Sequence, residues 1–264
     1  MKRREFITTS AALLAFSAHA QVVDLNDAIN KAGRQRMLSQ RISKAYLALA
    51  HKVEADSARQ VLDRSLALFD RQLAELKHFA PAPDIRETYV KLEAVWSEFK
   101  GAVVGAPPAR EHAAKVLQLD GAILALANQG TQQYERASAK AVGKLVNIAG
   151  RQRMLSQRMA KFYLAGAMKV DPQGSVAEIG KARAEFIAAL ETLRSAPETT
   201  PKIKEELALA DGQWLFFNRG LQQLDGAQQS PKLMSDVFVA SENLLSVMDS
   251  ITGLYSGIKA SRAA

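Results

Sequence analysis

Residues 30–48 read NKAGRQRMLSQRISKAYLA, and residues 147–165 read NIAGRQRMLSQRMAKFYLA. Fifteen of these 19 positions are identical at an offset of 117 residues. Weaker matches at offsets of 117 to 121 continue along the chain and pair Phe69 with Phe186, Leu73 with Leu190, Leu76 with Leu193, Trp96 with Trp214, Phe99 with Phe217 and Tyr134 with Tyr255. The chain is therefore an internal repeat of one unit of about 115 residues.

Each copy has the pattern of four amphipathic helices. All eight prolines lie at breaks between long stretches of helical periodicity, without the alternation typical of strands. We expect helices at roughly 24–54, 57–79, 84–103, 109–139, 140–169, 175–194, 200–224 and 231–259. The fourth and fifth are separated by no proline or loop-like composition, so one continuous rod is an alternative there. The prediction is an all-α chain of two tandem antiparallel four-helix bundles, over 21–138 and 139–264.

Composition excludes several classes of protein. Apolar residues make up 48% and charged residues 23% of the 264 positions, which is typical of a folded globular chain. There is no cysteine, so disulfide scaffolds, thiolate metal sites and cysteine nucleophiles are excluded. No carboxylate pair, nucleophile–base pair or phosphate loop has diagnostic spacing. We therefore expect no catalytic residues, no metal site and no cofactor, and an enzyme is the last of the hypotheses.

The first 20 residues have the pattern of an export signal. Basic residues at the start are followed by the apolar run from Ala11 to Phe16 and by Ala18-His19-Ala20, an A-x-A cleavage site. Arg3-Arg4 partly matches a twin-arginine leader, with the general secretory route as the other reading. No apolar run is long enough to span a membrane, and an uncleaved anchor is the alternative. We expect a periplasmic protein that does not bind nucleic acid, despite its net charge of +8.

One arginine of each repeated segment lies in the middle of an apolar helix face. On a helical wheel Arg36 and Arg153 take this position, and a second apolar stripe runs about 120° away. The residues that flank the two arginines are Gly33, Gly150, Ser39, Ser156, Gln40 and Gln157. A helix with two apolar stripes packs on two sides, so one stripe is expected to meet the repeated helix of the other copy. A glycine in mid-helix costs about 1 kcal/mol relative to alanine, which favours a close approach at Gly33 and Gly150.

The two arginines have no carboxylate on their own helices. No acidic residue occurs between Asp27 and Glu54, and none between Glu135 and Asp171. Two unpaired guanidinium groups facing each other in an interface need an anion, and their planar donors suit flat oxyanions. The other basic residues of the segments are expected to face solvent, namely Arg34, Arg41, Lys44, Arg151, Arg158 and Lys161.

At these residues the chain resembles a known family. The segment AINKAGRQRMLSQR resembles the P-box of nitrate/nitrite-sensing histidine kinases of the NarX type, and also the N-terminal domain of PilJ-type methyl-accepting transducers of type IV pili. In those kinases two bundles pair, and one arginine from each holds nitrate between the first helices. The resemblance implies that Arg36 and Arg153 take that role here. It implies a sensing module and identifies no output.

The leading hypothesis is a soluble periplasmic protein that binds or senses nitrate or nitrite, for signal transduction to a membrane-bound sensor or transporter. The predicted ligand-binding residues are Arg36, Arg153, Gly33, Gly150, Ser39, Ser156, Gln40 and Gln157. The second hypothesis is a structural or adaptor module of an envelope or pilus signalling complex that binds no small ligand. The third is a peripheral protein whose basic helices contact anionic lipid.

Overall fold

The computed structural model describes residues 21–224 and 230–258, and these ranges are helical apart from short connections. Their helices are α1 (Leu25–Ala50), α2 (Ala55–Phe79), α3 (Pro83–Val104), α4 (Arg110–Ser138), α5 (Ala141–Ala167), α6 (Pro172–Ser195), α7 (Pro201–Leu221) and α8 (Pro231–Ser256). The all-α prediction is confirmed. The expected leader, residues 1–20, lies outside the described residues.

Proline and hydroxyl side chains define several helix starts. Proline is the first residue of α3, α6, α7 and α8, where its missing amide hydrogen removes no helical hydrogen bond. Thr200 and Ser230 cap α7 and α8, because each hydroxyl oxygen accepts from a backbone amide three residues on, at 3.3 Å. The breaks at proline therefore fall where the sequence indicates them.

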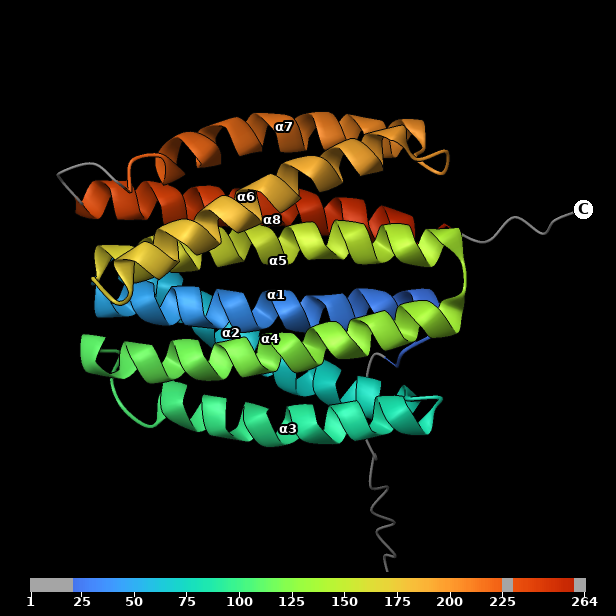
Figure 1. Ribbon diagram of the computed structural model, residues 1–264, viewed down its shortest axis with the longest axis horizontal. Helices are drawn as coiled ribbons and strands as arrows, with labels where there is room; N and C mark the ends of the chain where they lie inside the picture. Colours follow the sequence, from blue (N-terminus) through green and yellow to red (C-terminus); the bar gives the residue numbers. More distant parts are fainter. Residues whose placement is uncertain (1–20, 225–229, 259–264) are drawn as a thin grey trace, which may run out of the picture.

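The junction of α4 and α5 differs from the continuous rod that the sequence allows. Ala139 has φ 50° and ψ 25°, a left-handed conformation that ends α4, and α5 begins at Ala141. The two helices run in opposite directions from this turn (Figure 1). The rod is wrong because one left-handed alanine reverses the chain, and alanine carries no turn signal of its own.

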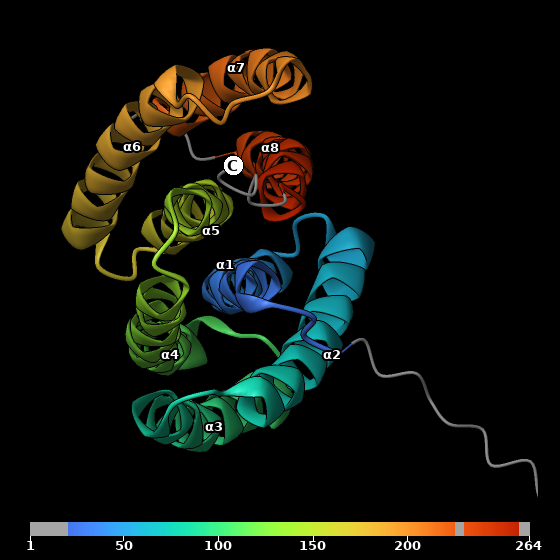
Figure 2. The same ribbon diagram turned by 90° about the vertical axis from the view of Figure 1, so that its right-hand side faces the viewer.

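Two four-helix bundles share one central interface. Helices α1–α4 form the first module and α5–α8 the second. The most extensive packing joins α1 to α5, which run side by side in the same direction (Figure 1). Seen end-on, these two helices lie at the centre, with α4 and α8 beside them and α2, α3, α6 and α7 outside (Figure 2). The repeated segments thus face each other across a pseudo-twofold axis.

The bundle interiors repeat as well. Phe69 stacks on Trp96 with ring centroids 3.8 Å apart, and Phe186 stacks on Trp214 at 4.6 Å. The hydroxyl of Tyr134 donates to the carbonyl of Leu76 at 2.8 Å, and Tyr255 donates to Leu193 at 3.1 Å. The core contains Phe69, Trp96, Tyr134, Phe186 and Tyr255, and the partly buried Trp214 packs against it. Among the described helices none is long and apolar enough to cross a membrane.

Candidate functional site

Four of the predicted site residues meet where α1 crosses α5. A Cβ atom placed on Gly33 would lie 3.9 Å from Gly150 Cα, 3.3 Å from Arg36 Nη2 and 3.6 Å from Arg153 Nη2. Both guanidinium groups therefore lie over the glycine pair, in space that side chains at 33 and 150 would narrow. The repeat predicts that these two glycines and two arginines lie together, and the structure places them so. Their binding role stays a prediction.

Arg36 is buried without a direct counter-ion. Arg36 is only 1% exposed, and no described carboxylate lies within ion-pair distance of its guanidinium group. Nη1 donates to Asn128 Oδ1 at 2.9 Å, and Nη2 donates to Asn147 Oδ1 at 2.6 Å. Its Nε has no hydrogen-bond partner.

The buried position of Arg36 lowers its pKa. Burial, together with the like charges of Arg151 and Arg153, lowers the pKa of Arg36 to about 9, although the carboxylates of Glu135 and Glu185 oppose this. Because burial disfavours the charged form of this guanidinium group, a nearby negative charge would stabilise it.

Arg153 differs because it has a counter-ion. Its Nη2 donates to the carbonyl of Asn30 at 3.0 Å, the counterpart of the contact between Arg36 and Asn147. Its Nη1 forms an ion pair with Asp249 of α8. The expectation of two unpaired guanidinium groups is therefore wrong for Arg153, because the carboxylate comes from another helix. Burial still lowers the pKa of Arg153 to about 10, aided by Arg34 and opposed by Asp249.

A second layer of arginines shares these contacts. Asn128 Oδ1 also accepts from Arg151 Nη1 at 3.2 Å, and Asp249 Oδ1 also accepts from Arg34 Nη2 at 2.7 Å. Arg151 is further paired with Glu185. Arg34 and Arg151 are thus half-buried members of the cluster and not simply solvated charges.

Sequence reasoning missed four residues of the site, Asn30, Asn147, Asn128 and Asp249. The first two are the opening positions of the repeated segments and are identical, so the repeat itself could have identified them. Asn128 and Asp249 lie 121 residues apart, which is the offset that also pairs Tyr134 with Tyr255.

The predicted serines and glutamines make other contacts. The hydroxyls of Ser39 and Ser156 donate to the carbonyls of Arg36 and Arg153 on their own helices, at 3.0 and 2.9 Å. Gln40 Nε2 donates to Asp120 Oδ1 of α4 at 2.6 Å, and Gln157 Nε2 donates to the carbonyl of Ser241 of α8 at 2.9 Å. These hydrogen bonds tie α1 and α5 to their neighbours and do not reach the guanidinium groups.

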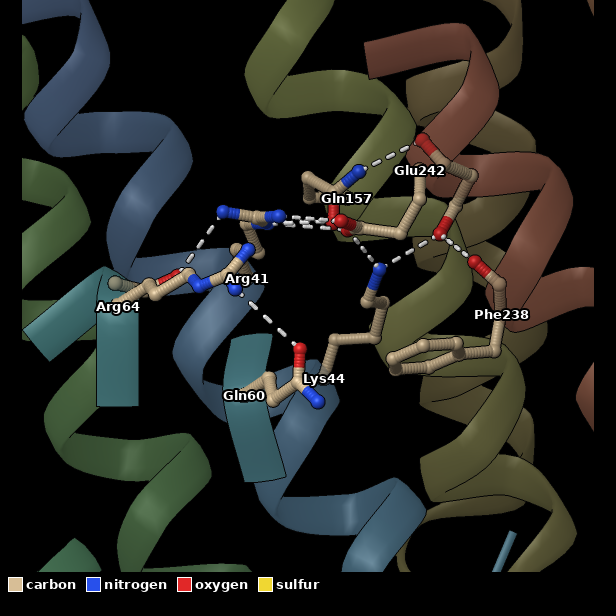
Figure 3. Close-up of polar contacts among 9 residues, drawn as sticks. Arg41, Lys44, Gln60, Arg64, Gln157, Phe238 and Glu242 are labelled. Atoms are coloured by element: carbon tan, nitrogen blue, oxygen red, sulfur yellow. Dashed lines mark hydrogen bonds and ion pairs between the residues drawn. The ribbon is translucent and has the colours of Figure 1, made fainter. Parts of the chain in front are cut away.

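Two lysines expected in solvent are buried. Lys44 Nζ donates to Ser241 Oγ at 2.8 Å and to Glu242 Oε1 at 2.6 Å, and Figure 3 shows Lys44 and Arg41 both pointing at Glu242. Burial lowers the pKa of Lys44 to about 8, although Glu242 opposes this. Lys161 pairs with Asp120 in the same way. The prediction that Lys44 and Lys161 face solvent is wrong, because α8 packs over α1 and α4 packs over α5.

Two grooves reach the arginine cluster from the two sides of the α1–α5 pair. One, of about 610 Å³, lies between α1, α2 and α8 and is lined by Arg34 and Asp249 among others. The other, of about 370 Å³, lies between α4, α5 and α6 and is lined by Arg151 and Asn128 among others. Each groove thus has one of the two aligned residues, Asp249 or Asn128, in its lining.

Comparison with known proteins identifies the family. The model for the N-terminal region of type IV pili methyl-accepting chemotaxis transducers, PilJ, matches twice, over residues 19–132 and 134–238. No curated protein and no solved structure matches the chain. The family is one of sensing and signalling domains, and no enzyme family is indicated. The two matched segments follow the repeat seen in the sequence, and the chain belongs to the PilJ family of transducer N-terminal domains.

Proposed function

We propose that the protein is a periplasmic sensor module that binds one small monovalent oxyanion, nitrate or nitrite first, at the crossing of α1 and α5. The observation that carries the proposal is the buried guanidinium of Arg36, which has no carboxylate partner among the described residues and lies beside Arg153. An unpaired buried charge is costly, and a bound anion removes that cost.

The charges of the cluster favour one negative charge. Arg34, Arg36, Arg151 and Arg153 are the four cations, and Asp249 and Glu185 pair directly with three of them. A third carboxylate, Glu135, acts on Arg36 only through Asn147, whose Nδ2 donates to Glu135 while its Oδ1 accepts from Arg36. One positive charge is left over, which matches a monoanion better than sulfate.

Hydrogen bonding supports an oxyanion. The Nε atoms of Arg36 and Arg153 are both buried without partners. Guanidinium donors form charge-assisted, paired hydrogen bonds to planar oxyanions, which halide ions cannot match in geometry. These unpartnered Nε donors are available to such an anion, and Gly33 and Gly150 carry no Cβ that would crowd the guanidinium groups.

Calorimetric titration with nitrate, nitrite, sulfate and chloride at equal ionic strength tests the proposal. We expect saturable binding of one nitrate or nitrite per chain. The ligand should also raise the free energy of unfolding by about 2.7 kcal/mol at a hundred times its Kd. Equal heats and equal melting curves for all four anions would contradict an oxyanion site.

A second function, that of an adaptor without a ligand, is favoured by one observation. The Nη atoms of both arginines already donate to Asn128, Asn147, Asn30 and Asp249, so the interface holds together without an anion. Under this function the titration would give no specific heat, and the modules would serve to present a surface to a membrane-bound partner.

The compartment is part of the proposal. Domains of this family are typically sensor regions outside the cytoplasm, which agrees with the leader expected at residues 1–20. Replacing Arg3 and Arg4 by lysine should block export if the leader uses the twin-arginine route. Normal export of that variant would favour the general secretory route.

A further inference from the structure

Asn128 and Asp249 occupy equivalent places in the two modules but differ in charge. Asn128 Oδ1 accepts from Arg36 Nη1 at 2.9 Å and from Arg151 Nη1 at 3.2 Å. Asp249 Oδ1 accepts from Arg153 Nη1 and, at 2.7 Å, from Arg34 Nη2. One oxygen thus bridges two guanidinium groups on each side of the pseudo-twofold axis. Only one of these oxygens belongs to an anion.

We propose that the anion binds on one side only: it enters through the groove between α4, α5 and α6 and takes the place of the Asn128 amide oxygen between Arg36 and Arg151. On the other side, Asp249 acts as a permanent counter-ion and closes the equivalent position. This inference rests on the proposed function and adds to it the route, a third arginine and the residue that determines which side is used.

The chemistry of the two positions supports the exchange. An amide oxygen gives each guanidinium a neutral hydrogen bond, whereas an oxyanion gives charge-assisted hydrogen bonds, which are roughly twice as strong. At Asp249 the bridging oxygen is itself charged, so charge-assisted bonds to both guanidinium groups already exist. On the Asn128 side Glu185 pairs with Arg151 only, and Arg36 has no direct charged acceptor. The position at Asn128 is therefore the one where an anion gains.

The grooves provide access to both positions, and their sizes do not decide between them. The larger groove, of about 610 Å³, is lined by Asp249, and the smaller, of about 370 Å³, is lined by Asn128 and Arg151. The bridging oxygen therefore favours the smaller groove, because it is neutral at Asn128 and charged at Asp249. The exposed Lys181 of this groove is paired with Glu178, so it adds no net charge to the approach.

Ala125 and Ser246 provide a matched pair of variants. They are aligned by the same offset of 121 residues, are both exposed, and line the smaller and the larger groove respectively. Each lies one helical turn before Asn128 or Asp249. Ala125→Trp would fill the smaller groove, through which the anion is proposed to enter. Ser246→Trp would place the same side chain in the larger groove.

The experiment is nitrate titration of the wild type and of Ala125→Trp, Ser246→Trp and Asn128→Asp, with circular dichroism to verify folding. We expect Ala125→Trp and Asn128→Asp each to weaken nitrate binding by about tenfold or more, and Ser246→Trp to change it by less than about twofold. Asn128→Asp should also raise the melting temperature of the anion-free protein, because its carboxylate supplies the missing charge.

The outcomes separate the two proposals. No nitrate or nitrite binding by the wild type would overturn the proposed function and this inference with it. Binding by the wild type that Ser246→Trp abolishes and Ala125→Trp leaves intact would overturn the one-sided route alone. Unchanged binding by a folded Asn128→Asp variant would likewise overturn only the role of Asn128.

Discussion

Lys161 of α5 and Asp120 of α4 form an ion pair whose side chains are only 2% and 0% exposed, and this pair joins the two modules. The same carboxylate accepts from Gln40 Nε2 of α1 at 2.6 Å. Three helices from both modules therefore meet at one buried charge. Such a pair depends on both partners, because the one that remains after a substitution is a buried, unpaired ion.

Asp120→Ala should therefore lower the free energy of unfolding by about 3–5 kcal/mol in urea denaturation. Glu87→Ala is the control, since the Lys91–Glu87 pair is exposed at 61% and 68% and should contribute no more than about 0.5 kcal/mol. A loss at Asp120 as small as that at Glu87 would mean that the buried pair does not hold the modules together.

Arg36→Lys should weaken nitrate binding by about tenfold although it keeps the positive charge, because an ammonium group lacks the planar pair of donors. Titration calorimetry measures the affinity. Arg59→Lys, at an exposed position of α2, is the matched control and should leave it unchanged. Equal affinity of the Arg36→Lys variant would show that the site recognises charge alone.

Gly150→Ala should disturb the site more than the fold. The added Cβ would lie 3.2 Å from Arg153 Nη2, the far end of a flexible side chain, so the guanidinium group must move. Alanine favours the helix by about 1 kcal/mol, which offsets the crowding. We expect weaker nitrate binding with a melting temperature close to that of the wild type. Gly101→Ala, which meets no atom within 4 Å, should raise stability and leave binding unchanged.

Acid should destabilise the contact between α1 and α8 through Glu242. Burial raises the pKa of this carboxyl group, but Lys44 and Arg41 outweigh burial and lower the pKa to about 2 from an ordinary value of 4.5. The folded state thus binds fewer protons than the unfolded state in this range. The stabilisation is present above about pH 4.5 and is lost as the pH falls toward 2.

Urea denaturation at pH 3 and pH 6 measures this effect. Glu242→Gln should lose less stability than the wild type between these two pH values, because it lacks the titrating group. Equal losses in the two proteins would show that Glu242 does not contribute to the acid sensitivity.

Helix positions and the crossing of α1 and α5 follow from local information. The repeated segment carries glycine and arginine on one face of a helix in both copies, and two such faces have a simple way of burying each other. Prolines indicate most of the chain breaks. The end of α4 at Ala139 could not be predicted in this way, because its left-handed backbone depends on how α5 packs and not on a turn-forming residue.

The sequence by itself determined the eight-helix duplication and placed Arg36, Arg153, Gly33 and Gly150 in one interface. Only the tertiary structure decided which charges meet there. Asp249 and Asn128 come from α8 and α4, about 96 and 92 residues from the arginines that they contact. A helical wheel shows which side chains share a face of one helix. The partners of that face depend on the register and angle of neighbouring helices, which packing of the whole core sets.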